Sequence, residues 1–142
     1  MEYDFEKLGK EIVVGKLRGV EDPYALAGEA ARKIAVAAVA STRGKQEPSV
    51  TVVATCRGVM SGMVLIEGDL AKTAVALLTQ MGAVAQETGL DPAECMTWAM
   101  QGIAPVVKAS SAATADHVRS AIEENFMGAG SVFDEILRTA GA

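Results

Sequence analysis

Apolar side chains recur every three or four residues between positions 52 and 84, which is the spacing of a buried helical face. The series is interrupted once, at Thr73, where a polar residue takes an apolar position. Only four charged residues lie within it. Flanking positions are also apolar, so the apolar surface is broader than one stripe. The pattern therefore predicts a long central helix that is packed on several sides. The members of this seam are Val52, Cys56, Val59, Met63, Ile66, Leu70, Leu77, Met81 and Val84.

The rest of the chain divides into shorter segments that also have helical spacing. We expect helices over residues 4–18, 24–42, 92–105 and 110–126, and from residue 131 onward. In Asp91-Pro92-Ala93-Glu94, Asp91 fits the N-cap and Pro92 the first helical position. Pro105 is expected to end or kink the helix that follows. Other side chains that we expect to cap helices are Asp22, Ser110, Ser111 and Ser131.

Two local features leave alternatives open. Residues 49–55 are rich in β-branched side chains, which favour a strand, but the helical seam begins inside them and no second strand is predicted. We favour a helix there. Gly68-Asp69 either divides the seam into two helices or lies within one bent helix. The predicted fold is all-α: a single domain, residues 1–142, forming an antiparallel helical bundle of five to six helices with a long apolar central helix.

Composition restricts the partners and the location of the protein. Half of its residues are apolar but only 4% are aromatic, so the core must consist of alanine and aliphatic side chains. The net charge is -5 and no basic patch is evident, so we expect no nucleic-acid partner. Residues 1–10 are acidic and amphipathic, unlike a secretory signal. No run approaches the roughly 20 apolar residues that cross a bilayer. We expect a cytoplasmic protein with no transmembrane segment.

Few side chains suggest catalysis. His117 is the only histidine and lies near the exposed side of its predicted helix. Cys56 and Cys95 lie in apolar helical segments, so we expect two buried thiols, with a disulfide as the alternative. Gly128-Ala129-Gly130 lacks the lysine and the strand-to-helix context of a phosphate loop. We therefore expect no catalytic site, no bound metal and no cofactor.

Five residues form the candidate interface: Arg57, Gly58, Gly62, Met63 and Trp98. Gly58 and Gly62 are four residues apart, which lets a second helix approach closely. Arg57 either extends into solvent beside the apolar surface or lies in a groove, where it would anchor a carboxylate or a partner chain. Trp98, the only tryptophan, either packs at the edge of the core or anchors a partner.

The breadth of the apolar surface favours a homo-oligomer, most simply a dimer, with a possible protein partner. We expect a non-enzymatic role in self-association and in partner or surface binding. A second hypothesis is a small-molecule-binding or regulatory bundle, and an enzyme that relies on carboxylates alone is the third. The Ala-rich amphipathic layout and the length resemble phasin-type granule-coating proteins in composition only, whereas the ordered helix caps favour a compact fold. The residues that would line an apolar pocket are Met60, Met63, Met81, Met96 and Met100.

Overall fold

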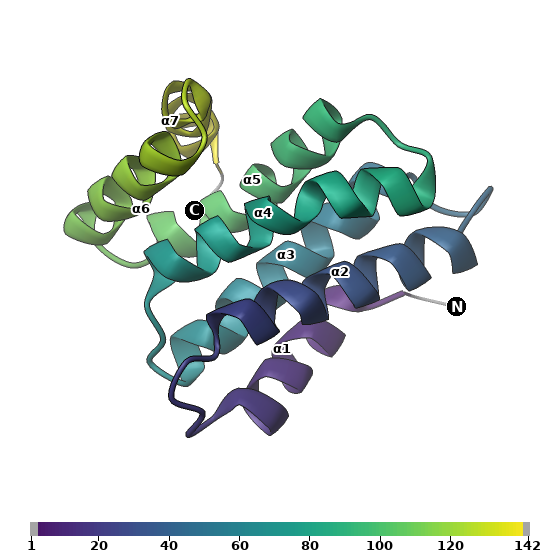
Figure 1. Ribbon diagram of the computed structural model, residues 1–142, viewed down its shortest axis with the longest axis horizontal. Coiled ribbons are helices and arrows are strands. Elements are labelled where there is room, and N and C mark those ends of the chain that lie inside the picture. The colour runs from purple at the N-terminus through teal and green to yellow at the C-terminus, as the bar shows by residue number, and fades with distance from the viewer. Residues whose placement is uncertain (1–2, 141–142) are drawn as a thin grey trace.

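The computed structural model describes residues 3–140, and every regular element in this range is an α-helix (Figure 1). The all-α prediction is confirmed, although this part of the chain has seven helices rather than five to six. The additional helix arises because the seam is divided in two. The helices are α1 (Phe5–Leu17), α2 (Tyr24–Ser41), α3 (Pro48–Leu65), α4 (Leu70–Thr88), α5 (Pro92–Lys108), α6 (Ala112–Asn125) and α7 (Ala129–Thr139).

The helices form two layers, and consecutive helices lie in alternate layers (Figure 1). In the first layer α1 contacts α3, α3 contacts α5, and α5 contacts α7; in the second, α2 contacts α4 and α4 contacts α6. The colours in Figure 1 show that α1, α3 and α5 run in one direction, as do α2 and α4 in the other. Helical-repeat proteins stack antiparallel helix pairs in this way. The arrangement is thus an open stack with two ends.

The seam is divided at Gly68-Asp69, which is one of the two alternatives left open by the sequence, so α3 and α4 replace the single long central helix of the predicted bundle. Glu67 has a positive φ of 60°, and the Gly68 N–H donates to the carbonyl of Met63 at 2.8 Å. The Asp69 side chain then caps α4 by accepting a backbone N–H of its first turn at 3.0 Å. Away from this turn, every seam residue in the two helices is fully buried. The spacing therefore predicted burial correctly but did not distinguish one bent helix from two.

Residues 49–55 are helical, as we favoured from the sequence. α3 begins with Pro48, whose missing N–H costs nothing at the first helical position. The buried hydroxyls are satisfied, because Thr55 donates to the Thr51 carbonyl at 2.9 Å and Thr51 accepts from the Gln46 amide at 2.8 Å. Burial between neighbouring helices outweighs the modest strand preference of this segment.

Of the five capping side chains expected from the sequence, Asp91 and Ser111 are confirmed, whereas Asp22, Ser110 and Ser131 do not cap a helix. Asp91 accepts the Glu94 N–H at 2.9 Å, and Ser111 accepts the Thr114 N–H at 3.0 Å. Asp22 does not cap α2, because the N-cap position is Pro23 and no side chain bonds to that turn. Capping was therefore predictable where the acceptor directly precedes the helix, and failed where a proline separates the two.

Pro105 does not end its helix, since α5 continues to Lys108. A proline in a helix removes the hydrogen bond to the carbonyl four residues earlier. That carbonyl belongs to Gln101, an exposed residue, so water can take the place of the lost donor. The chain thus tolerates this proline because the lost hydrogen bond lies on the solvent-exposed side of α5.

Helices of the same layer approach one another closely through glycines. A Cβ atom added to Gly58 would lie 2.1 Å from the Glu6 carbonyl oxygen, and one added to Gly28 would lie 2.9 Å from the carbonyl oxygen of Ala76. These contacts join α1 to α3 and α2 to α4, so they set the spacing of both layers. Glycines in such positions are Gly9, Gly28, Gly58, Gly62 and Gly102.

Within the described residues, α3 is the only helix long and apolar enough to span a membrane by length and composition, with a mean hydropathy of 1.3. Half of this helix is buried inside the chain, and α1, α2, α4 and α5 all contact it. A helix with neighbours on several sides is apolar around most of its circumference. Its packing therefore accounts for its composition.

We expect Gly58→Ala to destabilise the fold. The added methyl group must push α1 away from α3, and overpacking of this kind costs ~1–3 kcal/mol, which exceeds the gain of up to about 1 kcal/mol in helix propensity. Gly82→Ala is the matched control, because a Cβ added to this helical glycine meets nothing within 4 Å. Urea unfolding should show a loss of stability for the first variant and a small gain for the second. Equal midpoints would contradict the close packing of α1 on α3.

Candidate functional site

The outward face of α3 is the clearest candidate surface. Val50 is 53% exposed and Val64 is 46% exposed. Arg57, also exposed, lies between them, seven residues from each. Residues seven apart share one side of an α-helix. We call Val50, Arg57 and Val64 the α3 stripe. It carries large apolar side chains and a guanidinium on a helix that is otherwise part of the core.

Arg57 lies at a groove of about 280 Å³ between α1, α3 and α5. Its Nε atom lies 3.7 Å from Oε2 of Glu6, and both side chains remain about half exposed. Ion pairs of this kind, in contact with water, contribute little net stability. The groove also contains Val64 and, from α5, Pro105. Arg57 is thus held beside a groove of mixed polar and apolar lining by a partner that it can readily exchange.

Three of the five candidate interface residues lie inside the chain. Gly58 and Gly62 contact α1: a Cβ on Gly62 would lie 2.7 Å from Cβ of Val13. Met63 is fully buried in the core. The spacing of the two glycines did predict a close helix contact, but its partner is a helix of the same chain. The geometry therefore does not support a role for Gly58, Gly62 or Met63 in binding a second molecule.

Trp98 is half-buried against the core, so its indole lies at the core edge. This was one of the two roles considered from the sequence, the other being an anchor for a partner. Trp98 precedes Gly102 by one turn, and Gly102 packs on the backbone of α3 at Val53. Trp98 therefore lies in the helix that packs against α3 in the first layer. Of the five predicted residues, the structure keeps Arg57 and Trp98 accessible, both in the first layer.

A larger groove of about 830 Å³ lies on the second layer, between α2, α4 and α6. The hydroxyl of Tyr24 accepts the Asp69 N–H at 3.0 Å, and Nζ of Lys72 lies 5.5 Å from the centre of the Tyr24 ring. His117, exposed as predicted, lines the same groove from α6. This groove could not be predicted from the sequence, because its residues come from three separate helices.

The methionines predicted to line an apolar pocket fill the core instead. Met60, Met63 and Met81 are fully buried, and Met100 is 3% exposed. Met96 is half-buried and packs against the same core. None of them lines the grooves described above. Their flexible side chains serve to fill gaps between closely packed helices.

Cys56 and Cys95 are free cysteines whose side chains are buried, which confirms the expected burial. Burial, and secondarily the neighbouring Cys95, raises the pKa of Cys56 from 9.0 to about 12. Burial also raises the pKa of Cys95, with smaller contributions from Asp91 and Glu94. Both groups are therefore held as neutral thiols, which are poor nucleophiles.

The N-terminus of α7 is already occupied by an anion of the chain itself. The Glu123 carboxylate accepts the N–H groups of Gly128 and Gly130, at 2.9 and 3.0 Å. Ser131 was expected to cap this helix but lies within it, and its hydroxyl donates to the Gly128 carbonyl at 3.1 Å. The capping group lies in the preceding helix, five residues before Gly128. N-caps are usually formed by the residue that directly precedes the helix, so the sequence did not indicate this one.

Among residues 3–140, no group of three or more His, Cys, Asp or Glu side chains is arranged to hold a metal ion. No family model, no curated protein and no solved structure matches this chain. The candidate site therefore rests on the geometry of the two faces alone.

The raised pKa of Cys56 predicts a pH dependence of stability. The folded chain holds this proton more tightly than the unfolded chain, whose thiol titrates near its ordinary value of 9.0. The free energy of unfolding should be unaffected below this value and fall as the pH rises from there towards 12, by at most about 1.4 kcal/mol per pH unit. Urea unfolding at mildly and strongly alkaline pH measures this slope. Cys56→Ser should show a shallower fall, and identical slopes would rule out this thiol as the cause.

Proposed function

We propose that this protein acts by association with other proteins, including a second copy of itself, and not by catalysis. The observation that carries the proposal is the α3 stripe, in which two half-exposed valines flank an arginine. Apolar and arginine side chains together are typical of the centres of protein interfaces. The partly buried Trp98 in the neighbouring helix adds a second side chain of the kind that anchors partners.

The pairing of Arg57 suggests how a partner would be recognised. Glu6 holds the guanidinium at 3.7 Å in contact with water, so exchanging Glu6 for a carboxylate of the partner costs little. In the bound state this carboxylate would be shielded from water, where a bidentate pair with arginine is stronger. The partner that fits is a helix or loop with apolar side chains and an acidic residue among them. We place the protein in the cytoplasm on its composition.

Small-molecule binding is the second candidate, and one observation favours it. The groove between α2, α4 and α6 has a volume of about 830 Å³, within the usual range for ligand sites. Tyr24, Lys72 and His117 line it and could orient a polar ligand. The groove is open and the rest of its lining is a mixture of alanine and polar side chains, among them Glu21, Asp22 and Asp69, so it offers less apolar burial than a typical ligand pocket. A granule-coating role of the phasin type is weaker still, because most apolar faces are used inside the stack.

Val64→Glu should abolish partner binding without unfolding the chain. The substitution introduces a charge into the α3 stripe, and exposed positions tolerate such changes within about 0.5 kcal/mol. Val132→Glu is the matched control, because Val132 on α7 is 44% exposed, close to the 46% of Val64. Affinity capture from native lysate, quantified by mass spectrometry, should recover the same partners with the wild type and with Val132→Glu. At least about a tenfold loss is expected for Val64→Glu, which corresponds to about 1.4 kcal/mol of binding free energy.

Arg57→Met separates the cation from the apolar contacts, because it keeps most of the length of the side chain. If a carboxylate of the partner binds Arg57, this variant should lose partner binding while its thermal stability stays close to that of the wild type. Unchanged capture by both Val64→Glu and Arg57→Met would show that the α3 stripe is not the binding face.

A further inference from the structure

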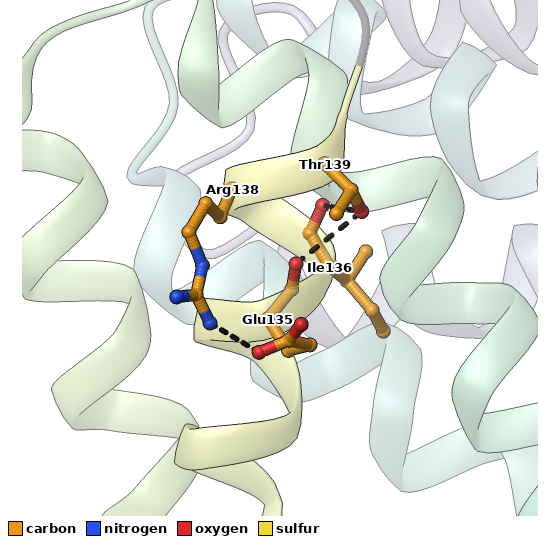
Figure 2. Close-up of polar contacts among 4 residues, drawn as sticks. All are labelled: Glu135, Ile136, Arg138 and Thr139. Atoms are coloured by element: carbon orange, nitrogen blue, oxygen red, sulfur yellow. Dashed lines mark hydrogen bonds and ion pairs between the residues drawn. The ribbon is translucent and has the colours of Figure 1, made fainter.

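The two ends of the stack differ in chemistry. At the C-terminal end, Glu135 and Arg138 form an ion pair on the exposed side of α7 (Figure 2), and their side chains are 67% and 71% exposed. Asp134, also on α7, pairs with Arg119 of α6 at 3.7 Å. A charged outer surface of this kind is what the terminal unit of a helical stack needs in order to remain in contact with water.

The N-terminal end also has exposed charges, among them Lys7, Lys10 and Glu11 of α1, but they lie beside an apolar groove. α1 and α2 form a groove of about 350 Å³ there, lined by apolar side chains and bordered by three charged ones, Lys16, Glu29 and Lys33. Leu26 is 45% exposed, although it lies on a well-formed helix. The apolar residues of this groove are Ile12, Leu17, Leu26, Ala30 and Ile34.

The same face permits close approach of another helix. Leu8, Ile12 and Gly15 follow helical spacing on α1, and Leu8 is 42% exposed. A Cβ added to Gly15 meets nothing within 4 Å. The glycines that face other helices of the chain allow backbone contact, and Gly15 offers the same possibility on a face that this chain leaves open.

We propose that a second copy of this chain covers the α1–α2 groove and forms a two-fold symmetric dimer. The proposal rests on the self-association part of the proposed function and identifies its surface. Two-fold dimers are the commonest soluble assemblies, and they require a patch that is complementary to itself. An end-to-tail contact would instead have to place this apolar groove on the charged surface of α7.

The charges at the groove satisfy this requirement. Glu29 and Lys33 are both exposed and are one turn apart on α2. When two α2 helices cross antiparallel about an axis between these residues, Glu29 of one copy faces Lys33 of the other, twice. Within residues 3–140, neither of them takes part in an ion pair.

The available area sets the strength of the dimer. α2 has 18 residues, so it is about 27 Å long, and two adjacent helices are about 20 Å wide, which gives ~500 Å² of contact per copy. The total of ~1,000 Å² is at the lower limit for a specific interface. The dimer should therefore dissociate on dilution through the micromolar range.

Size-exclusion chromatography with light scattering, over a range of protein concentrations, tests the proposal. The wild type and Val64→Glu should be dimers that dissociate on dilution, and Leu26→Glu should remain a monomer. Circular dichroism and thermal unfolding establish that each variant is folded. A Leu26→Glu chain that still forms dimers would overturn the assignment of the groove and leave self-association intact. A wild type that is monomeric at every concentration would overturn both the assignment of the groove and the proposed self-association.

A charge exchange tests the register and does not depend on Leu26→Glu being folded. Glu29→Lys should weaken the dimer by about tenfold, because it places like charges opposite one another. Adding Lys33→Glu to the same chain restores opposite charges across the axis and should restore the affinity. If the double variant dimerises no better than Glu29→Lys alone, the two-fold arrangement of α2 against α2 is wrong. Both residues are exposed, so the fold should tolerate each change.

Discussion

Contact between the backbones of alternate helices is the constraint on which this structure depends. The chain has few aromatic residues and many alanines, so each side chain buries little area. Such a core reaches the density of protein interiors only when the helix axes are close. Gly58 brings α3 against α1, Gly102 brings α5 against α3, and Gly28 brings α4 against α2. The layers follow from these three contacts, and so does the exposure of whichever faces they leave uncovered.

The sequence predicted burial far better than arrangement. Helical spacing identified the buried seam because an apolar helical face is buried whichever neighbouring helix packs on it. The same spacing could not decide between a break and a bend at Gly68, since the positions on either side of the turn stay in phase. It also could not name the helix that contacts Gly58 and Gly62. Their small size indicates that something approaches closely, and only the fold shows that this is α1.

The candidate site was predictable where it depends on one helix and unpredictable elsewhere. Arg57 was identified because a charge within an apolar helix is visible in the sequence. The groove around Tyr24 and Asp69 was not, because these residues are 45 positions apart and meet only after α2 and α4 have packed. The Glu123 carboxylate at α7 was missed for a related reason, because a side chain on one helix caps the next.

The layered order also governs how the molecule would come apart. α7 contacts only α5 and α6, and α1 contacts only α2 and α3, whereas α3 contacts four helices. Opening one end therefore breaks contacts with two helices and leaves those at the opposite end unchanged. α4 and α5 likewise contact four helices each, so amide protons should exchange fastest in the outermost helices and slowest in α3, α4 and α5. Resistance to unfolding then forms a gradient along the stack, with its maximum in the middle, instead of a single value for the whole chain.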